Sequence, residues 1–132
     1  MLLEGKKVLI VEDEPGAIRS YKFKFSEMEE VSKVIFKIAI NAKEAREIIE
    51  TDHPDLIYLD LRLGESKNPE GLEILKEYSK KYNIIIVSGF DEYEDECLAM
   101  GAKGYIVKAF DFLKAMEDGE KILNSTSTQQ RT

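Results

Sequence analysis

Four short apolar runs, separated by stretches with helical periodicity, constrain the fold of this chain more than any other feature. They cover residues 8–11, 56–59, 84–87 and 105–107. Apolar runs of this length that alternate with helices are typical of a parallel β-sheet buried on both faces. A polar or charged residue follows each run, and the carboxyl ends of parallel strands lie at one edge of a sheet, where ligands bind. The pattern therefore predicts that three acids, a hydroxyl and a lysine meet in one small site.

Strands and helices alternate along the whole chain. The strands are predicted at about 6–11, 34–38, 56–60, 84–88 and 104–108. The helices are predicted to begin near Pro15, at Asn41, after a polar loop at 62–71, at Asp91 and at Asp111. Five β–α units of this size predict an α/β three-layer sandwich, with a five-stranded parallel sheet in order 2-1-3-4-5 and five helices. The second strand carries no reactive side chain at its end and suits the edge of the sheet.

Local signals predict several helix ends. Asn41 is followed three residues later by Glu44, which resembles a capping box. The strongly acidic fourth helix, 91–100, should stop at Gly101. The apolar face of the first helix is predicted to consist of four residues at helical spacing, namely Ile18, Tyr21, Phe25 and Met28.

Composition excludes several classes of protein. The chain has 132 residues and a formal net charge of -7, which argues against direct nucleic-acid binding and against anionic membrane surfaces. It contains no apolar stretch near the roughly 20 residues that a membrane span needs. A lone cysteine, Cys97, fits a reducing cytoplasm. With one cysteine and one histidine, a zinc site built on those ligands is excluded.

Carboxylates dominate the predicted site. Glu12, Asp13 and Asp60 would repel one another at close range unless a cation lay between them. Oxygen ligands without imidazole or thiolate suit a hard ion such as Mg²⁺. The alternative for Glu12 and Asp13 is a solvated turn ahead of a helix, which the helix dipole favours. The alternative for Asp60 is a turn residue at the end of a strand.

Four segments together resemble, in order and spacing, the receiver domain of bacterial response regulators. They are 11–15 (VEDEP), 60–61 (DL), 88–89 (SG) and 100–108 (MGAKGYIVK). The resemblance covers roughly residues 5–124 and implies a flavodoxin-like fold. It divides the chain into a receiver domain at 1–124 and a polar tail at 125–132, frayed or the start of a linker. It also implies Mg²⁺ as the cofactor, bound by Asp13, Asp60 and the backbone carbonyl of Arg62, with Glu12 acting through water.

The resemblance further implies that Asp60 accepts a phosphoryl group from a histidine kinase or a phosphotransfer protein. Lys108 would supply a positive charge, and Ser88 would donate its hydroxyl to a phosphoryl oxygen. Ser88 is otherwise a helix N-cap, a role that Asp91 could equally fill. Tyr105 would be the switch aromatic that turns inward as the hydroxyl shifts; otherwise it is a half-buried tyrosine of a strand.

The function implied is that of a signalling switch, not an enzyme. Phosphorylation would bias the face made by the fourth helix, the fifth strand and the fifth helix, where a downstream protein would dock. Two departures from the family keep a phosphorylation-independent binding module as the alternative. Ala109 follows Lys108 where the family usually has proline, and the loop at 63–71 is longer than usual.

Two enzyme-like readings fit less well. A phosphatase of the haloacid-dehalogenase type needs a second aspartate two residues after the nucleophile, where this chain has Arg62. A flavin-binding electron carrier needs a phosphate cradle after the first strand, where residues 12–14 are all acidic. Two further residues are predicted to be structural: His53 in a surface turn, and Cys97 on a buried helix face with Tyr93 and Met100.

Overall fold

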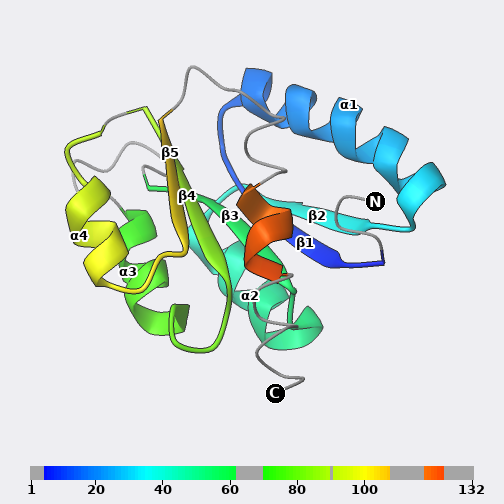
Figure 1. The fold of residues 1–132 in the computed structure, drawn as a ribbon. Coiled ribbons are helices and arrows are strands. Elements are labelled where there is room, and N and C mark those ends of the chain that lie inside the picture. Colours follow the sequence, from blue (N-terminus) through cyan, green and yellow to red (C-terminus); the bar gives the residue numbers. More distant parts are fainter. Residues whose placement is uncertain (1–4, 62–69, 90, 108–117, 124–132) are drawn as a thin grey trace.

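The computed structural model describes residues 5–61, 70–89, 91–107 and 118–123. Its elements, in chain order, are β1 (Lys7–Val11), α1 (Pro15–Ser32), β2 (Ile35–Ala39), α2 (Ala42–Asp52), β3 (Leu56–Asp60), α3 (Glu70–Tyr78), β4 (Ile84–Ser88), α4 (Glu94–Ala99) and β5 (Gly104–Val107). A further helical segment covers residues 118–123. Figure 1 shows these elements as three layers with the sheet in the middle. The α/β three-layer prediction is confirmed.

The five strands form one parallel sheet in the order β2-β1-β3-β4-β5, as predicted from the sequence. The register opposes Val11 to Leu59 and Asp60 to Val87, and it opposes Ser88 to Val107. Helix α1 and the helical segment 118–123 cover one face of the sheet, and α2, α3 and α4 cover the other (Figure 1). All the strands therefore end at the same edge.

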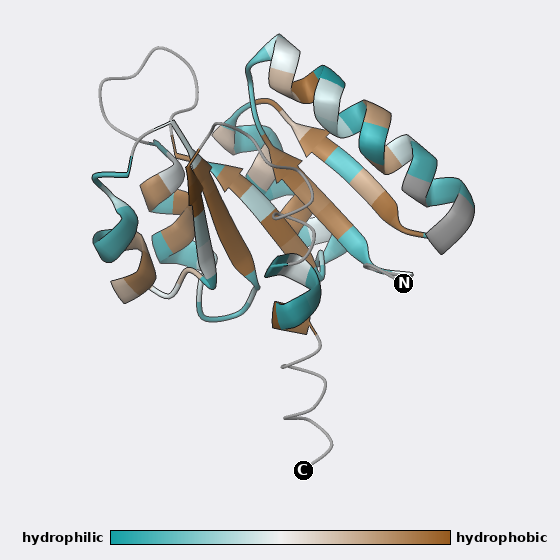
Figure 2. Cartoon of the chain, turned by 45° about the horizontal axis from the view of Figure 1, so that its top comes forward, coloured by the Kyte–Doolittle hydropathy of each residue, from teal (hydrophilic) through white to brown (hydrophobic). Residues whose placement is uncertain are grey.

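Alternation of side chains in the strands fills two apolar cores. Leu9, Ile57 and Ile86 point toward α2, α3 and α4, whereas Ile10 and Tyr58 point toward α1. Figure 2 shows the strands as mainly apolar ribbons between helices whose outer faces are hydrophilic. Burial of β1, β3 and β4 on both faces explains why their sequences read as continuous apolar runs.

Helix α2 begins and ends as the sequence indicates. The Asn41 side chain accepts a hydrogen bond from the Glu44 N–H at 2.8 Å, and the Glu44 carboxylate accepts one from the Ile40 N–H at 3.0 Å. The helix ends at His53, an exposed residue with a φ of 50°, which confirms its place in a surface turn. Its Nδ1 lies 2.8 Å from the Tyr82 hydroxyl.

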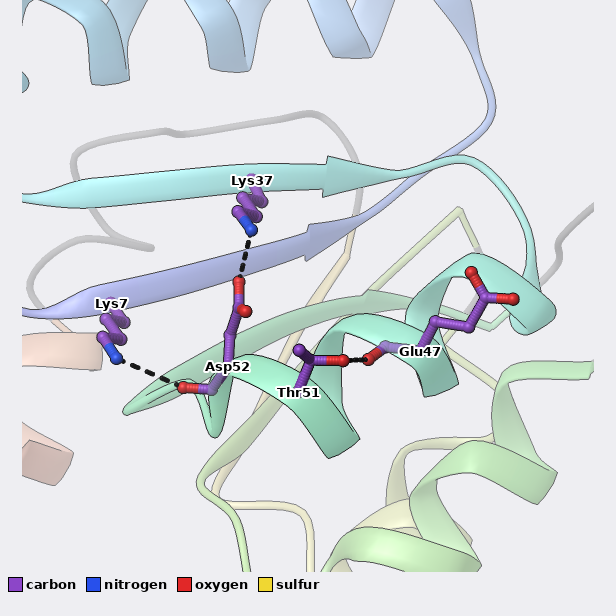
Figure 3. A network of polar contacts seen from close by, with 5 residues as sticks. All are labelled: Lys7, Lys37, Glu47, Thr51 and Asp52. Carbon is purple, nitrogen blue, oxygen red and sulfur yellow. Dashed lines mark hydrogen bonds and ion pairs between the residues drawn. The ribbon is translucent and has the colours of Figure 1, made fainter.

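Two lysines hold the C-terminal end of α2 (Figure 3). Lys37 Nζ lies 2.6 Å from Asp52 Oδ2, and Lys7 Nζ donates to the Asp52 carbonyl at 3.4 Å. Cations at this position complement the negative end of the helix dipole. Both lysines therefore connect the C-terminal end of α2 to the two strands that carry them, β1 and β2.

The predicted start of the acidic helix was wrong. Helix α4 begins at Glu94 instead of Asp91, and its N-cap residue, Tyr93, makes no side-chain cap hydrogen bond. The Asp91 carbonyl only accepts a turn hydrogen bond from the Glu94 N–H, at 3.1 Å. Extension of the helix to 91 would place like charges four residues apart at Asp91 and Asp95, which is unfavourable. Cys97 is buried on this helix, and Tyr93 and Met100 pack against the same core, as predicted.

Within the described residues, no helix combines the length and apolar character that crossing a membrane requires.

Candidate functional site

The carboxyl edge of the sheet gathers the acidic residues predicted from the sequence. Glu12 and Asp13 follow β1, and Asp60 is the last residue of β3. One carboxylate oxygen from each residue lies within 4.8 Å of the other two. Glu12 is only 1% exposed and Asp60 only 7%, whereas Asp13 is half-buried. Three carboxylates thus share one small and largely buried volume.

The chain's own turn holds Glu12 in place. Its Oε2 atom accepts hydrogen bonds from the N–H groups of Asp13, at 3.1 Å, and Glu14, at 3.2 Å. Its N–H donates to the Ala39 carbonyl at 2.9 Å, which extends the β1–β2 ladder by one residue. Two backbone donors thus hold this carboxylate in one orientation. Glu12 therefore belongs to the site as a fixed group and is not a solvated turn residue.

The backbone around Asp60 is held by Gly71 at the start of α3. The Gly71 N–H donates to the Leu61 carbonyl at 2.8 Å. A Cβ atom on Gly71 would lie 2.5 Å from the Asp60 carbonyl oxygen and 2.6 Å from Leu61 Cα. Only glycine allows this approach, so the residue at 71 helps to fix the position of Asp60. Gly71 was expected in an altered loop, and its contact with Asp60 was not predicted from the sequence.

Ser88 ends β4 and is buried, at the same edge as Asp60. Its side chain is hydrogen-bonded to that of Tyr105 on the neighbouring strand, β5. Burial raises the pKa of Tyr105, while this hydrogen bond acts in the opposite direction. Since α4 begins six residues later, Ser88 is not its N-cap, and Asp91 is not either. Tyr105 is half-buried, and its hydroxyl bonds to the site's serine.

The carboxylate cluster fits a hard divalent cation. Burial of three carboxylates together is unfavourable because like charges repel most strongly away from water. A cation removes this repulsion, and Mg²⁺ is bound in proteins by one or two carboxylates and several waters. The residues that the structure brings together, Glu12, Asp13 and Asp60, supply such a set of ligands.

Two predicted site residues, Arg62 and Lys108, lie outside the described residues, as do Ala109 and most of the loop at 63–71. Their expected roles stay predictions. A further residue, Tyr21, lies near the site and was not predicted to do so. Tyr21 of α1 is buried, and its pKa is raised first by burial and then by the charges of Glu12 and Asp60, among others.

Comparison with known proteins places this geometry in a family. A family model described as the response regulator receiver domain matches residues 8–118. The sensory transduction protein LytT of Bacillus cereus is 28% identical over 126 residues, which are 96% of this chain and 50% of that protein. The nitrate/nitrite response regulator protein NarL of Escherichia coli is 31% identical over 133 aligned positions, gaps included, and the match covers 95% of this chain and 61% of NarL. The chain thus spans about half to three-fifths of these curated relatives.

Solved structures agree with the family match. The response regulator TrrA of Thermotoga maritima, in a complex with Mg²⁺ and BeF, is 28% identical with a TM-score of 0.73, covering 88% of this chain and 97% of that chain. A CheY-like receiver domain protein of Methanospirillum hungatei is 26% identical with a TM-score of 0.78, covering 94% and 98%. With the fold, the carboxylate cluster and the sequence match in agreement, the chain belongs to the response regulator receiver domain family of two-component signalling.

Proposed function

We propose that this receiver domain accepts a phosphoryl group on Asp60 in a Mg²⁺-dependent reaction, from a histidine kinase or a phosphotransfer protein. The observation that carries the proposal is the position of Asp60, a nearly buried carboxylate at a strand end with two further carboxylates within 4.8 Å. A strand-terminal turn residue would have no reason to be buried among like charges. We assign the domain to residues 1–124, with 125–132 as its polar tail, and the cytoplasm as its compartment.

The transfer uses Asp60 as the nucleophile. One carboxylate oxygen attacks the phosphorus atom of the donor, and an O–P bond forms as the P–N bond to the donor imidazole breaks. The departing nitrogen keeps the electron pair. Such a transfer depends on in-line geometry and charge neutralisation more than on proton transfer. Gly71 holds the backbone of Asp60 against α3 and so contributes to that geometry.

Asp13 and Asp60 would bind Mg²⁺ directly, together with the backbone carbonyl of Arg62, and Glu12 would act through water. When bound, the ion neutralises negative charge on the carboxylates and the phosphoryl oxygens. Glu12 is already oriented for this role by two backbone N–H groups. The positive charge on the opposite side of the phosphoryl group would come from Lys108.

The phosphoryl group would act on the hydrogen bond between Ser88 and Tyr105. If the Ser88 hydroxyl turns to a phosphoryl oxygen, its hydrogen bond to Tyr105 changes. The side chain of Tyr105, on β5, packs against the core that α4 covers. Leu98 of α4 and Val107 of β5 are exposed apolar side chains. We therefore place the docking surface for a downstream protein on the face made by α4, β5 and the last helix. A partner that binds to this surface shifts the equilibrium between the unphosphorylated and phosphorylated packings only by the difference in its affinity for the two.

The test is intact mass after incubation with phosphoramidate, with and without Mg²⁺. Wild type should gain one phosphoryl group only with Mg²⁺, because the ion must neutralise the carboxylate cluster. Asp60→Asn should gain none, and Asp95→Asn, a change at an exposed aspartate of α4, should behave as wild type. If neither phosphoramidate nor acetyl phosphate labels the wild type, the domain is a phosphorylation-independent binding module. Two features of the sequence favour that alternative, namely Ala109 and the long loop after Asp60.

A further inference from the structure

The tyrosine at position 21 reaches from α1 toward the acidic site. Helix α1 begins at Pro15, so Tyr21 lies less than two turns from its start. Side chains of an α-helix tilt toward its N-terminus, which here is the end next to Glu12 and Asp13. Tyr21 is 3% exposed and packs in the core between α1 and the sheet. The side chain therefore leans, inside the protein, toward the carboxyl edge of the sheet.

The strands place the carboxylates directly above this core. Ile10 and Tyr58 oppose each other in the register of β1 and β3, and both belong to the core that α1 covers. Side chains two residues apart in a strand lie on the same face. Glu12 and Asp60 thus continue that face by one step. The ring of Tyr21 lies 6.4 Å from the ring of Tyr58, in the layer beneath the two acids.

Electrostatics support the same arrangement. After burial, the charge of Glu12 is the largest influence that raises the pKa of Tyr21, followed by Tyr58 and Asp60. Both carboxylates therefore lie near enough to Tyr21 for their charges to act on its hydroxyl. The neighbouring Tyr58 differs, since its pKa is raised by burial and then by Asp118 of the last helical segment. Of the two tyrosines, only Tyr21 is affected by both acids of the site.

We propose that Tyr21 is a positioning residue for the metal site, and that its hydroxyl donates a hydrogen bond to the Glu12 carboxylate, directly or through one water. Two backbone N–H groups already fix Glu12 Oε2, and a third donor from below would stop the carboxylate from rotating. Groups that orient metal ligands in this way commonly change metal affinity when they are removed. The proposal rests on the Mg²⁺ site of the proposed function and adds to it a residue from α1.

The decisive variant is Tyr21→Phe, which keeps the ring and removes only the hydroxyl. Mg²⁺ affinity is measured by isothermal titration calorimetry on the full chain. We expect about tenfold weaker binding than in wild type. Phosphorylation by phosphoramidate should need a correspondingly higher Mg²⁺ concentration than in wild type to reach half of its maximal rate, because the variant lowers occupancy of the metal site.

Two control variants separate positioning from stability. Tyr78→Phe removes another buried hydroxyl, which bonds to Glu50 at 2.8 Å on the opposite face of the sheet. Ile10→Val loosens the core around Tyr21 without removing a polar group. Both should lower thermal stability and leave Mg²⁺ affinity unchanged. The inference is overturned if Tyr21→Phe binds Mg²⁺ as wild type does, or if Ile10→Val weakens binding equally. If wild type itself binds no Mg²⁺, the proposed function fails first.

Discussion

Substitution of Gly71 by alanine tests how tightly the site depends on the packing of α3. Gly71 is the second residue of that helix, and a Cβ atom there would lie 2.5 Å from the Asp60 carbonyl oxygen. It would also lie 2.6 Å from Leu61 Cα. Both neighbours are backbone atoms, which cannot rotate out of the way. Either α3 or the end of β3 must therefore move in the variant.

The size of the effect follows from these distances. Relief of the overlap to an ordinary contact needs a shift of about 1 Å. Overpacking of this kind costs about 1–3 kcal/mol. Replacement of glycine by alanine in a helix gains up to about 1 kcal/mol, and with two backbone clashes we expect a net loss of about 2 kcal/mol. For a domain of this size, this lowers the melting temperature by about 6–10 °C.

Urea denaturation and thermal unfolding of Gly71→Ala measure the loss of stability. Calorimetry measures Mg²⁺ affinity, which should fall because Asp60 is displaced.

Gly16→Ala is the matched control in the first turn of α1. Its Cβ would approach only Glu14 Oε1, at 2.9 Å, the end of a flexible side chain. It should be neutral or stabilising by up to about 1 kcal/mol. If Gly71→Ala is as stable as wild type, the argument that this glycine fixes Asp60 is wrong.

Three further outcomes are expected. Burial raises the pKa of Cys97 to about 11, so its thiol stays protonated at pH 8. It should therefore react with a disulfide reagent far more slowly in the native protein than in protein unfolded by guanidinium. Equal rates would contradict the burial of Cys97. Burial raises the pKa of Tyr21 and Tyr58 above that of tyrosine in the unfolded chain, so their contribution to stability is complete below about pH 10 and falls at higher pH. Urea denaturation from about pH 8 to 11 measures this loss of stability. Asn41→Ala removes the N-cap of α2 and should cost about 1 kcal/mol by the same method, whereas an unchanged midpoint would mean that water replaces the cap.

The fold was predictable because its sheet is buried on both faces. The central strands β1, β3 and β4 then read as apolar runs, and the one strand without a reactive end, β2, lies at the sheet edge. The start of α4 was not predictable from helix propensity, because two opposing effects act on the acidic stretch 91–96. The carboxylates repel one another, whereas the helix dipole stabilises them near the N-terminus of the helix. The cap at Asn41 was predictable because both of its partners are local in sequence.

The site was predictable where strand ends supply its groups. Glu12, Asp13 and Asp60 meet as expected. Tyr21 and Gly71 were missed because their contacts depend on how helices dock on the sheet, which the sequence pattern does not specify. The alternation of side chains in β1 and β3 did contain a signal for Tyr21. It puts Glu12 and Asp60 on the face of the sheet that the apolar side of α1 covers.

The two ends of the sheet carry charge in different ways, and the difference bears on switching. At the amino end, Lys37 and Lys7 are fixed on Asp52 by the fold itself. At the carboxyl end, three carboxylates lie together, and the contacts described there are mainly hydrogen bonds to backbone N–H groups and to hydroxyls. A metal ion or a phosphoryl group would therefore change the charge at one end of the sheet, while the contacts that anchor α2 lie at the other. A switch of this kind needs only the few kcal/mol that separate two packings of its surface.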